Sequence, residues 1–141
     1  MPRPPEHGYA IMRDALNRTG RPILFSACEW GVDFPATWMQ GVANSWRTTF
    51  DIQYSWECVV AHVDWTNIYA DFAKPGAFND MDILNVGNPH SACDFITRPL
   101  RHDCDSTTPT MNMTEWRSHY SLWIVMKVRR EACLLFCSMA S

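Results

Sequence analysis

Short apolar runs alternate with helical patterns along the chain, and this alternation limits the possible folds more than any other feature. Runs typical of buried strands cover residues 23–27, 45–49 and 78–84, while helical spacing covers 8–17, about 36–42, 54–61 and 64–72. Gly20 is expected to end the first helix, and a last helix is expected to begin near Thr114. Helices and strands in this alternation predict an α/β fold of repeated βα units with parallel strands.

Charge and spacing exclude several classes of partner. The chain has 141 residues and a net charge of −3, which gives no basic surface for nucleic acid. No run of 18 apolar residues is present, so no membrane partner is expected. None of the cysteine and histidine spacings fits zinc, and neither a metal nor a cofactor is predicted. The high tryptophan content suits either a sugar site or a packed core.

The N-terminus and two glycosylation sequons bear on localisation. The first ten residues contain no apolar stretch typical of a signal peptide, so none is expected in this chain. Sequons at Asn17 and Asn112 make these residues glycosylation candidates and favour a secreted parent protein. Both sequons also suit ordinary turn and loop chemistry.

Polar residues follow each of the three predicted strands. They are Glu29 and Trp30 after the first strand, Arg47 and Asp51 at the second, and Asn79, Asp80 and Asp82 at the third. In a parallel barrel the carboxyl ends of the strands meet on one face, where active sites lie. Paired carboxylates with aromatic walls are the groups that glycoside hydrolysis uses. The same residue types also cap helices and form turns, so the pattern alone leaves both interpretations open.

Six segments in series resemble one enzyme family. They are RDALNRTGRPI (13–23), FSACEWG (25–31), NSWRTTFDI (44–52), PGAFNDMDIL (75–84), VGN (86–88) and HYSLW (119–123). In this order and spacing they resemble the α-galactosidase (melibiase) family, glycoside hydrolase family 27, over residues 8–88 and 113–127. The resemblance implies a retaining hydrolase that removes terminal α-linked galactose, with galactosides as substrate, on a (β/α)8 barrel followed by a β domain.

The resemblance also implies which part of the barrel is present. The matched segments correspond to strands five to seven with their helices, and a closed barrel needs about 250 residues. A partial, unclosed TIM barrel is therefore expected over residues 1–127, with an insert at about 89–112 and a non-matching tail at 128–141. The family's nucleophile is an aspartate in a Lys-Tyr-Asp-Asn-Cys type motif, which this sequence lacks. The chain alone is therefore expected to be inactive, and its oligomeric state is not predicted.

Two residues carry the catalytic expectations of the resemblance. Asp51 matches the acid/base carboxylate, which first protonates the leaving oxygen and then deprotonates water. Its alternative role is to cap the helix that follows. Arg47 matches a sugar-binding arginine whose planar fork can bridge a hydroxyl and a carboxylate. Its alternative role is a structural ion pair.

The remaining carried-over positions surround the sugar. Cys28, Glu29, Trp30 and Ile83 match substrate-binding positions, and Asp80 and Asp82 are expected mainly to support the site. A glutamate at position 29 goes with galactose in the family, whereas the related α-N-acetylgalactosaminidases, which remain an alternative, carry a small residue there. The family's disulfide partner of Cys28 lies in the absent nucleophile motif, so Cys28 is expected to be unpaired or mispaired.

Several segments depart from the family pattern. Met81 replaces the usual proline, and about twenty extra residues precede the helix near Thr114. The insert and the tail after Lys127 are interpreted as translated intron; the alternative for the insert is a native active-site loop closed by a Cys93–Cys104 disulfide. Two alternatives to an enzyme segment also stay open. One is a non-catalytic galactose-binding protein, and the other is a fragment without a function of its own.

Overall fold

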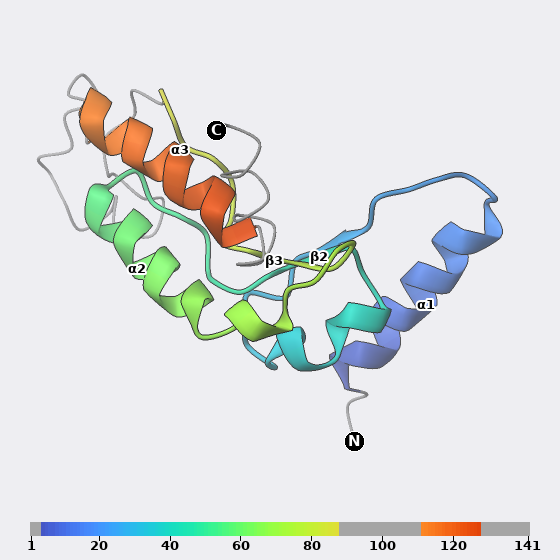
Figure 1. Ribbon diagram of the computed structural model, residues 1–141. Helices are drawn as coiled ribbons and strands as arrows, with labels where there is room; N and C mark the ends of the chain where they lie inside the picture. The colour runs from blue at the N-terminus through green and yellow to red at the C-terminus, as the bar shows by residue number, and fades with distance from the viewer. Residues whose placement is uncertain (1–3, 88–110, 128–141) are drawn as a thin grey trace, which may run out of the picture.

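The computed structural model describes residues 4–87 and 111–127, which form helices and short strands in alternation (Figure 1). The elements are α1 (Pro5–Arg18), β1 (Ser26–Ala27), the 3₁₀ helices η1 (Pro35–Thr37) and η2 (Met39–Gly41), β2 (Ser45–Arg47), α2 (Trp56–Asn67), the 3₁₀ helix η3 (Ala70–Phe72), β3 (Phe78–Asp80) and α3 (Met113–Lys127). The predicted α/β class is confirmed.

The sheet is parallel, as predicted, with the strand order β1-β2-β3. Trp46 of β2 lies opposite Ala27 on one side and Asn79 on the other. Arg47, the last residue of β2, lies opposite Asp80. Because the strands run in the same direction, their carboxyl ends all lie at one end of the sheet, which is called the carboxyl edge below. Within the described residues the sheet is open, with β1 and β3 at its edges.

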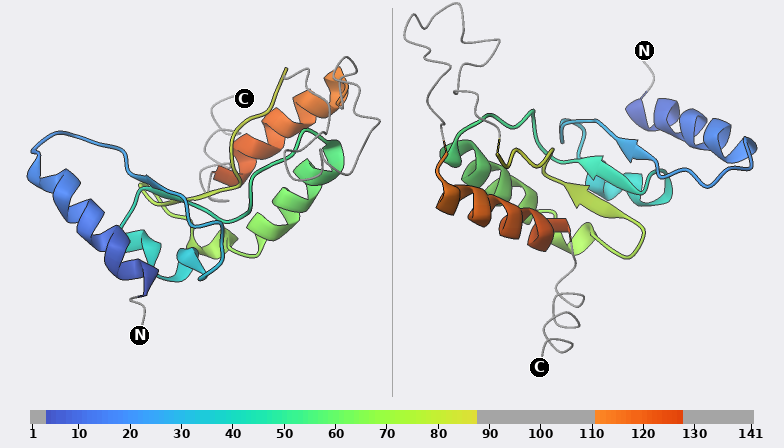
Figure 2. Two further views of the ribbon diagram at one scale, coloured as in Figure 1. Left: turned by 180° about the vertical axis from the view of Figure 1, so that it is seen from behind. Right: turned by 90° about the horizontal axis from the view of Figure 1, so that it is seen from above.

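The helices lie at the two ends of the sheet. Figures 1 and 2 show α1 beside the β1 end, while α2 and α3 pack alongside each other near β3. Two groups of buried apolar residues form the core. The first group is Ala27, Ala36, Met39, Ala43, Trp46 and Ala77, and the second is Ile52, Val59 and Met111. The second group fills the space between the loop after β2 and the α2–α3 pair.

Local sequence signals explain where several elements start and stop. Gly20, just beyond α1, has a φ of 68°, the left-handed conformation that favours glycine, so the predicted stop is confirmed. The Ser55 hydroxyl caps α2 by accepting the backbone N–H of Cys58 at 3.2 Å. Asn112 caps α3, because its Oδ1 accepts the N–H groups of Thr114 and Glu115 at 2.9 and 3.1 Å. A Glu115 carboxylate oxygen accepts the Asn112 N–H at 2.7 Å, which completes a capping box.

Several predicted elements need correction. The helix predicted at 36–42 is two 3₁₀ helices, because Trp38 between them has φ −128° and ψ −20°, outside helical geometry. The helices predicted at 54–61 and 64–72 are one helix, α2, followed by η3. The start of α3 is set by Asn112 rather than Thr114. The predicted strands are also longer than the observed ones.

Some expectations fall outside the described residues. These include residues 88–110, with Cys93 and Cys104, and the tail at 128–141. None of the helices within residues 4–87 and 111–127 combines the length and the apolar character that a membrane crossing needs.

Candidate active site

Arg47 lies at the centre of the polar cluster at the carboxyl edge of the sheet. Its Nη1 forms an ion pair with Asp82 Oδ1 at 2.9 Å, and its Nη2 forms one with Asp51 Oδ1 at 3.2 Å. Nη2 also donates to the Thr49 carbonyl oxygen at 3.0 Å. Cys28 Sγ, at the end of β1, lies 3.9 Å from Nη1. One guanidinium therefore connects the ends of all three strands.

Asp82 holds Arg47 from the β3 side. Its side chain is 8% exposed, and its Oδ2 accepts the Ile52 N–H at 2.7 Å. The Asp82 backbone has a φ of 88°, which is uncommon for a residue with a side chain, and its N–H donates to Asp80 Oδ1 at 3.0 Å. The Trp123 indole of α3 donates to the Asp82 carbonyl oxygen at 2.8 Å. Bonds from three segments thus fix Asp82 in a strained conformation.

Asp51 differs from Asp82 in its exposure. The Asp51 side chain is 67% exposed, and its Oδ1 forms the ion pair with Arg47. Ser55, rather than Asp51, caps α2, so the alternative role of Asp51 as a helix cap is wrong. The arrangement leaves a carboxylate that is fixed on one side by a guanidinium and open to solvent on the other.

The segment after β1 brings a further carboxyl group, that of Glu29, near this edge. Glu29 Oε1 accepts the Asp33 N–H at 2.9 Å, and its Oε2 is buried without a hydrogen-bond partner among the described residues. Burial, and to a smaller degree the nearby Asp33 carboxylate, raises the pKa of Glu29. Glu29 shares no hydrogen bond or ion pair with Arg47 or Asp51. The Glu29 carboxyl group instead contacts the backbone of its own loop, at Asp33.

Trp30 is half-exposed rather than part of the core. The Trp30 backbone has a φ of 62°. Its ring packs edge-to-face with the Phe50 ring, and the two ring centroids are 5.9 Å apart. Phe50 in turn meets Trp65 of α2 at 6.4 Å. These rings line an apolar hollow of about 220 Å³ next to the Asp51 segment. The sequence alone does not indicate a role for Phe50 and Trp65, because they lie on separate elements and show no common spacing.

Other predicted site residues occupy simpler positions. Ile83 is exposed, one residue beyond Asp82. Cys28 is exposed and free within the described residues. Asn17 and Asn112 are both exposed, and the Asn112 side chain also caps α3. No group of three or more His, Cys, Asp and Glu side chains in the described part of the chain is placed to hold a metal ion.

A buried polar link that the sequence analysis missed sets the register beneath the site. Trp46 Nε1 donates to Asn79 Oδ1 at 2.9 Å, and Asn79 Nδ2 donates to the Tyr69 carbonyl oxygen at 2.6 Å. Both side chains are almost fully buried. Because Trp46 and Asn79 are directly opposite in the sheet, this bond helps to align Arg47 with Asp80. Asn79 is therefore a structural connector rather than a group at the open edge.

Comparisons with known proteins are consistent with this geometry. A family model described as alpha galactosidase A matches residues 3–98. Alpha-galactosidase 3 of Arabidopsis thaliana is 42% identical over 87% of this chain and 24% of its own length. Alpha-galactosidase A of Cellvibrio japonicus is 38% identical over 86% of this chain and 28% of its own. The crystal structure of alpha-galactosidase I from Mortierella vinacea matches 88% of this chain and 31% of its own, with a TM-score of 0.65 and 26% identity. The chain thus spans about a quarter of the length of these curated relatives.

Proposed function

We propose, because this chain belongs to the alpha galactosidase A family, that it supplies one side of the active site of a retaining α-galactosidase. The observation that carries the proposal is the Arg47 guanidinium, which joins buried Asp82 and exposed Asp51 at the carboxyl ends of adjacent strands. An exposed carboxylate held at this edge is placed where barrel enzymes bind their substrates.

Asp51 is the acid/base group in this proposal. A retaining glycosidase needs a carboxyl group about 5 Å from its nucleophile that protonates the leaving oxygen and later deprotonates water. The Arg47 fork fixes the side chain of Asp51, and Asp82 fixes Arg47 in turn. The resemblance also makes Arg47 a sugar-binding arginine; in the chain alone its Nη1 and Nη2 already contact protein groups, and its Nε is buried without a partner among the described residues.

The three described strands correspond in this proposal to strands five to seven of a (β/α)8 barrel. The nucleophile comes from the fourth strand, which the matched segments do not include. The chain without that strand therefore has no hydrolase activity. An assay with an aryl α-galactoside tests this: we expect no turnover above the buffer blank. Turnover that Asp51→Asn abolishes would contradict it.

Galactose is the proposed sugar, with Glu29 limiting the space near its 2-position. This choice rests on the resemblance, in which a glutamate at position 29 goes with galactose and a small residue there leaves room for an N-acetyl group; the Asp33 N–H holds the Glu29 carboxylate at 2.9 Å. An α-N-acetylgalactosaminidase is therefore the less favoured substrate class. A secretory location and glycosylation at Asn17 and Asn112 belong to the same proposal and rest on the sequons.

The role of Asp51 can be tested in a complete enzyme that carries these residues. With Asp51→Asn, substrates with poor leaving groups should lose turnover by several orders of magnitude, because the general acid is gone. Activated aryl galactosides need little protonation, so they should still show a first-step burst followed by slow release. Asp64→Asn, an exposed carboxylate on α2, is the matched control and should change neither step. Equal loss on activated and unactivated substrates would make Asp51 structural.

The non-catalytic alternative has its own measurement. Isothermal titration of the chain with galactose, compared with glucose as a control sugar, reports binding without turnover. Two results together would favour a galactose-binding protein over an enzyme. The chain would bind galactose saturably and lose this binding with Arg47→Ala, and a complete enzyme that carries these residues would show no activity.

A further inference from the structure

Cys58 and His62 form a pair on α2 that the proposed sugar chemistry does not use. Cys58 lies in the first turn of the helix, and His62 lies one turn later, so that Cys58 Sγ is 3.5 Å from His62 Nδ1. His62 is 2% exposed, whereas Cys58 is partly exposed and free. The pair packs behind the segment that carries Asp51.

Both ring nitrogens of His62 face backbone carbonyl oxygens. Nδ1 lies 2.9 Å from the Cys58 oxygen, and Nε2 lies 2.9 Å from the Phe50 oxygen. A carbonyl oxygen only accepts hydrogen bonds, and a neutral imidazole carries one N–H. A neutral ring would therefore set one nitrogen lone pair against a carbonyl oxygen. The doubly protonated imidazolium makes both bonds, so the geometry favours a charged His62.

A buried imidazolium needs an anion, and the Cys58 sulfur is in place to provide it. Cys58 Sγ accepts the Gln53 N–H at 3.1 Å, and it lies at the N-terminal end of α2, where the helix dipole favours negative charge. Although burial acts the other way on each group, their mutual contact lowers the pKa of Cys58 and raises the pKa of His62. Both shifts favour the charged pair.

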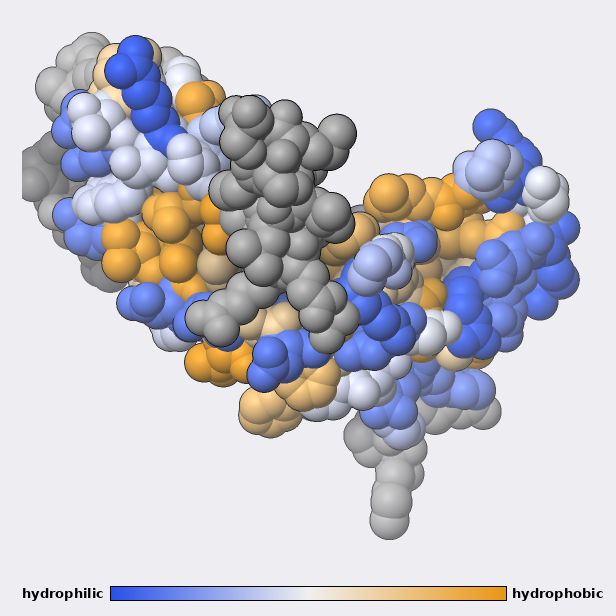
Figure 3. Space-filling view, in the orientation of Figure 1, coloured by the Kyte–Doolittle hydropathy of each residue, from blue (hydrophilic) through white to orange (hydrophobic). Residues whose placement is uncertain are grey.

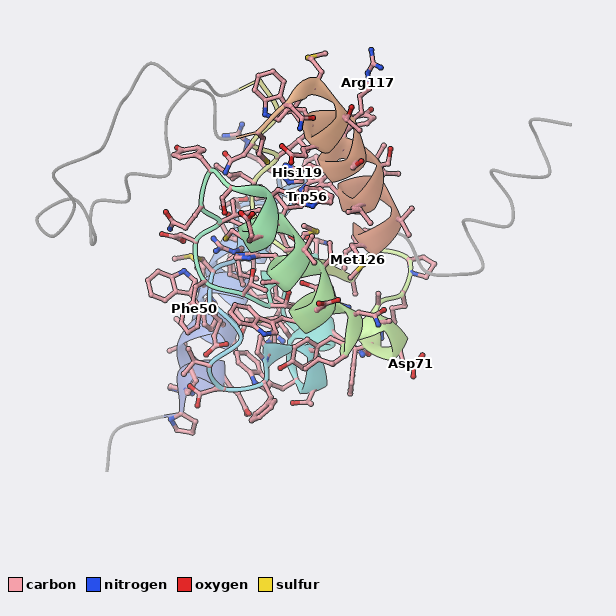
Figure 4. All side chains as sticks on the ribbon, turned by 90° about the vertical axis from the view of Figure 1, so that its left-hand side faces the viewer. Phe50, Trp56, Asp71, Arg117, His119 and Met126 are labelled. Atoms are coloured by element: carbon pink, nitrogen blue, oxygen red, sulfur yellow. The ribbon has the colours of Figure 1, made fainter. Side chains whose placement is uncertain are left out.

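The neighbouring titratable groups are compatible with one charged histidine here. The negative charge of the Asp82 carboxylate raises the pKa of Cys58 and so disfavours the thiolate, but this carboxylate is already paired with Arg47. His119 of α3 faces α2, as Figure 4 shows, and is completely buried with both ring nitrogens unpartnered within the described residues. Burial first, and the charge of His62 second, lower the pKa of His119. His119 is therefore the neutral member of the two histidines.

From this geometry we infer that Cys58 is an activated thiol, held as a thiolate by the His62 imidazolium, and that it is a modification site for soft electrophiles. With an alkyl halide, the sulfur lone pair forms the S–C bond while the C–halogen bond breaks and the halide leaves. The thiolate already lacks its proton, so the imidazolium keeps both of its own. No oxidant or reductant is needed.

Modification of Cys58 has a structural consequence for the Asp51 segment. The neutral thioether is a weak acceptor, so the Gln53 N–H loses its charged partner, and the His62 imidazolium loses its counter-ion. His62 also holds the Phe50 carbonyl, the residue before Asp51. We expect the amide of Gln53 to exchange its hydrogen faster after alkylation.

Limiting iodoacetamide with peptide mapping by mass spectrometry measures the reactivity of Cys58. The rate constant is measured from about pH 5.5 to 8.5, for the native chain and for the same chain in urea, which reports the same thiol without its partners. At about pH 6 the native thiol should react at least tenfold faster than the unfolded one, because an ordinary thiol is mostly protonated there. In urea the rate should fall about tenfold per pH unit.

Two variants separate the pair from general exposure. His62→Gln keeps a polar group but removes the charge, and should return Cys58 to the rate of the unfolded chain at low pH. His7→Gln, on the exposed side of α1, is the matched control and should leave the rate unchanged. Because His62→Gln can also disturb the fold, the pH profile of the wild-type chain is decisive. A native rate that falls with pH in parallel with the unfolded rate would overturn the proposal.

Discussion

At the scale of single residues, Arg47 serves two carboxylates that differ in their surroundings. The Asp82 side chain is 8% exposed and is held by a second bond from Ile52, whereas the Asp51 side chain is 67% exposed. A buried ion pair costs little only while both partners are present, and an exposed pair contributes little in any case. The two ion pairs should therefore have different roles: Asp82 positions Arg47, and Asp51 is left available for chemistry.

Asp82→Asn should destabilise the chain much more than Asp51→Asn. Asp82→Asn keeps the shape of the side chain but leaves the buried Arg47 charge without its closer partner, a change that typically costs about 3–5 kcal/mol. Asp51→Asn removes a solvent-exposed partner and should cost about 0–1 kcal/mol. The urea concentration at which half of the helical ellipticity is lost ranks the two variants without assuming a two-state transition. Equal midpoints for the two variants would show that Asp82 does not hold Arg47.

At the scale of structural elements, the loop after β1 approaches the backbone of Thr48 so closely that only a glycine fits at position 31. Gly31 has a φ of 77°, and a Cβ at this position would collide with the Thr48 carbonyl carbon and oxygen. This contact brings the loop after β1 against the end of β2, so the aromatic rings of Trp30 and Phe50 can meet. Neither atom of the carbonyl can move away freely, because both belong to the backbone next to the sheet.

Gly31→Ala should therefore destabilise the chain by more than the strain of an alanine in the left-handed backbone conformation alone. Gly76 is the matched control, because its φ is 80° and a Cβ there would meet nothing within 4 Å. Gly76→Ala should lose about 1 kcal/mol from the backbone conformation, and Gly31→Ala should lose clearly more. Urea midpoints of the two variants test the difference. If the two midpoints coincide, the loop after β1 does not pack on Thr48.

The packing of α3 on α2 makes stability depend on pH through His119. Its pKa is lowered by burial and by His62, so the unfolded chain binds the proton more strongly than the folded chain. The stabilisation is complete above the unfolded pKa of about 6.5 and is lost as pH falls through the lower folded pKa. Urea midpoints at about pH 7 and pH 5 should therefore drop on acidification. His119→Leu removes this contribution, so its drop should be smaller. An unchanged drop in the variant would show that His119 does not titrate differently on folding.

The elements also show how far the sequence could predict this structure. Alternation of apolar runs and helical spacing predicted the parallel order and the meeting of Arg47 with Asp82, because parallel strand direction brings the ends of β2 and β3 together. It failed at 36–42, where Trp38 leaves helical geometry and divides the segment into two 3₁₀ helices. It also missed the pairing of Cys58 with His62. The i, i+4 spacing was visible, but the two carbonyl acceptors come from the fold.

At the scale of the whole molecule, the described residues form an open, curved assembly instead of a closed one. Helices α2 and α3 lie at one end and α1 lies at the other, with the sheet edges β1 and β3 unpaired within the described part of the chain (Figure 2). Figure 3 shows apolar surface over the α2–α3 pair and near the segment that joins α1 to the sheet. Leu24, Phe34 and Ile68 are each more than 60% exposed. A closed barrel would pair these edges and cover such groups.

The open sheet predicts that the chain by itself unfolds without a sharp transition. The two separate groups of buried residues stabilise the elements unequally, so α1 and the α2–α3 pair should lose structure over different temperature ranges. Ellipticity followed against temperature should fall gradually, and the exposed apolar groups should bind the dye ANS before heating. Sedimentation of the same sample establishes that the species is a monomer, because pairing of two open edges would cover the apolar surface. A complete family enzyme, with its barrel closed, is the control and should melt cooperatively without binding ANS. A sharp two-state transition in the monomer would contradict the prediction, since it would mean that these strands and helices hold together without the rest of a barrel.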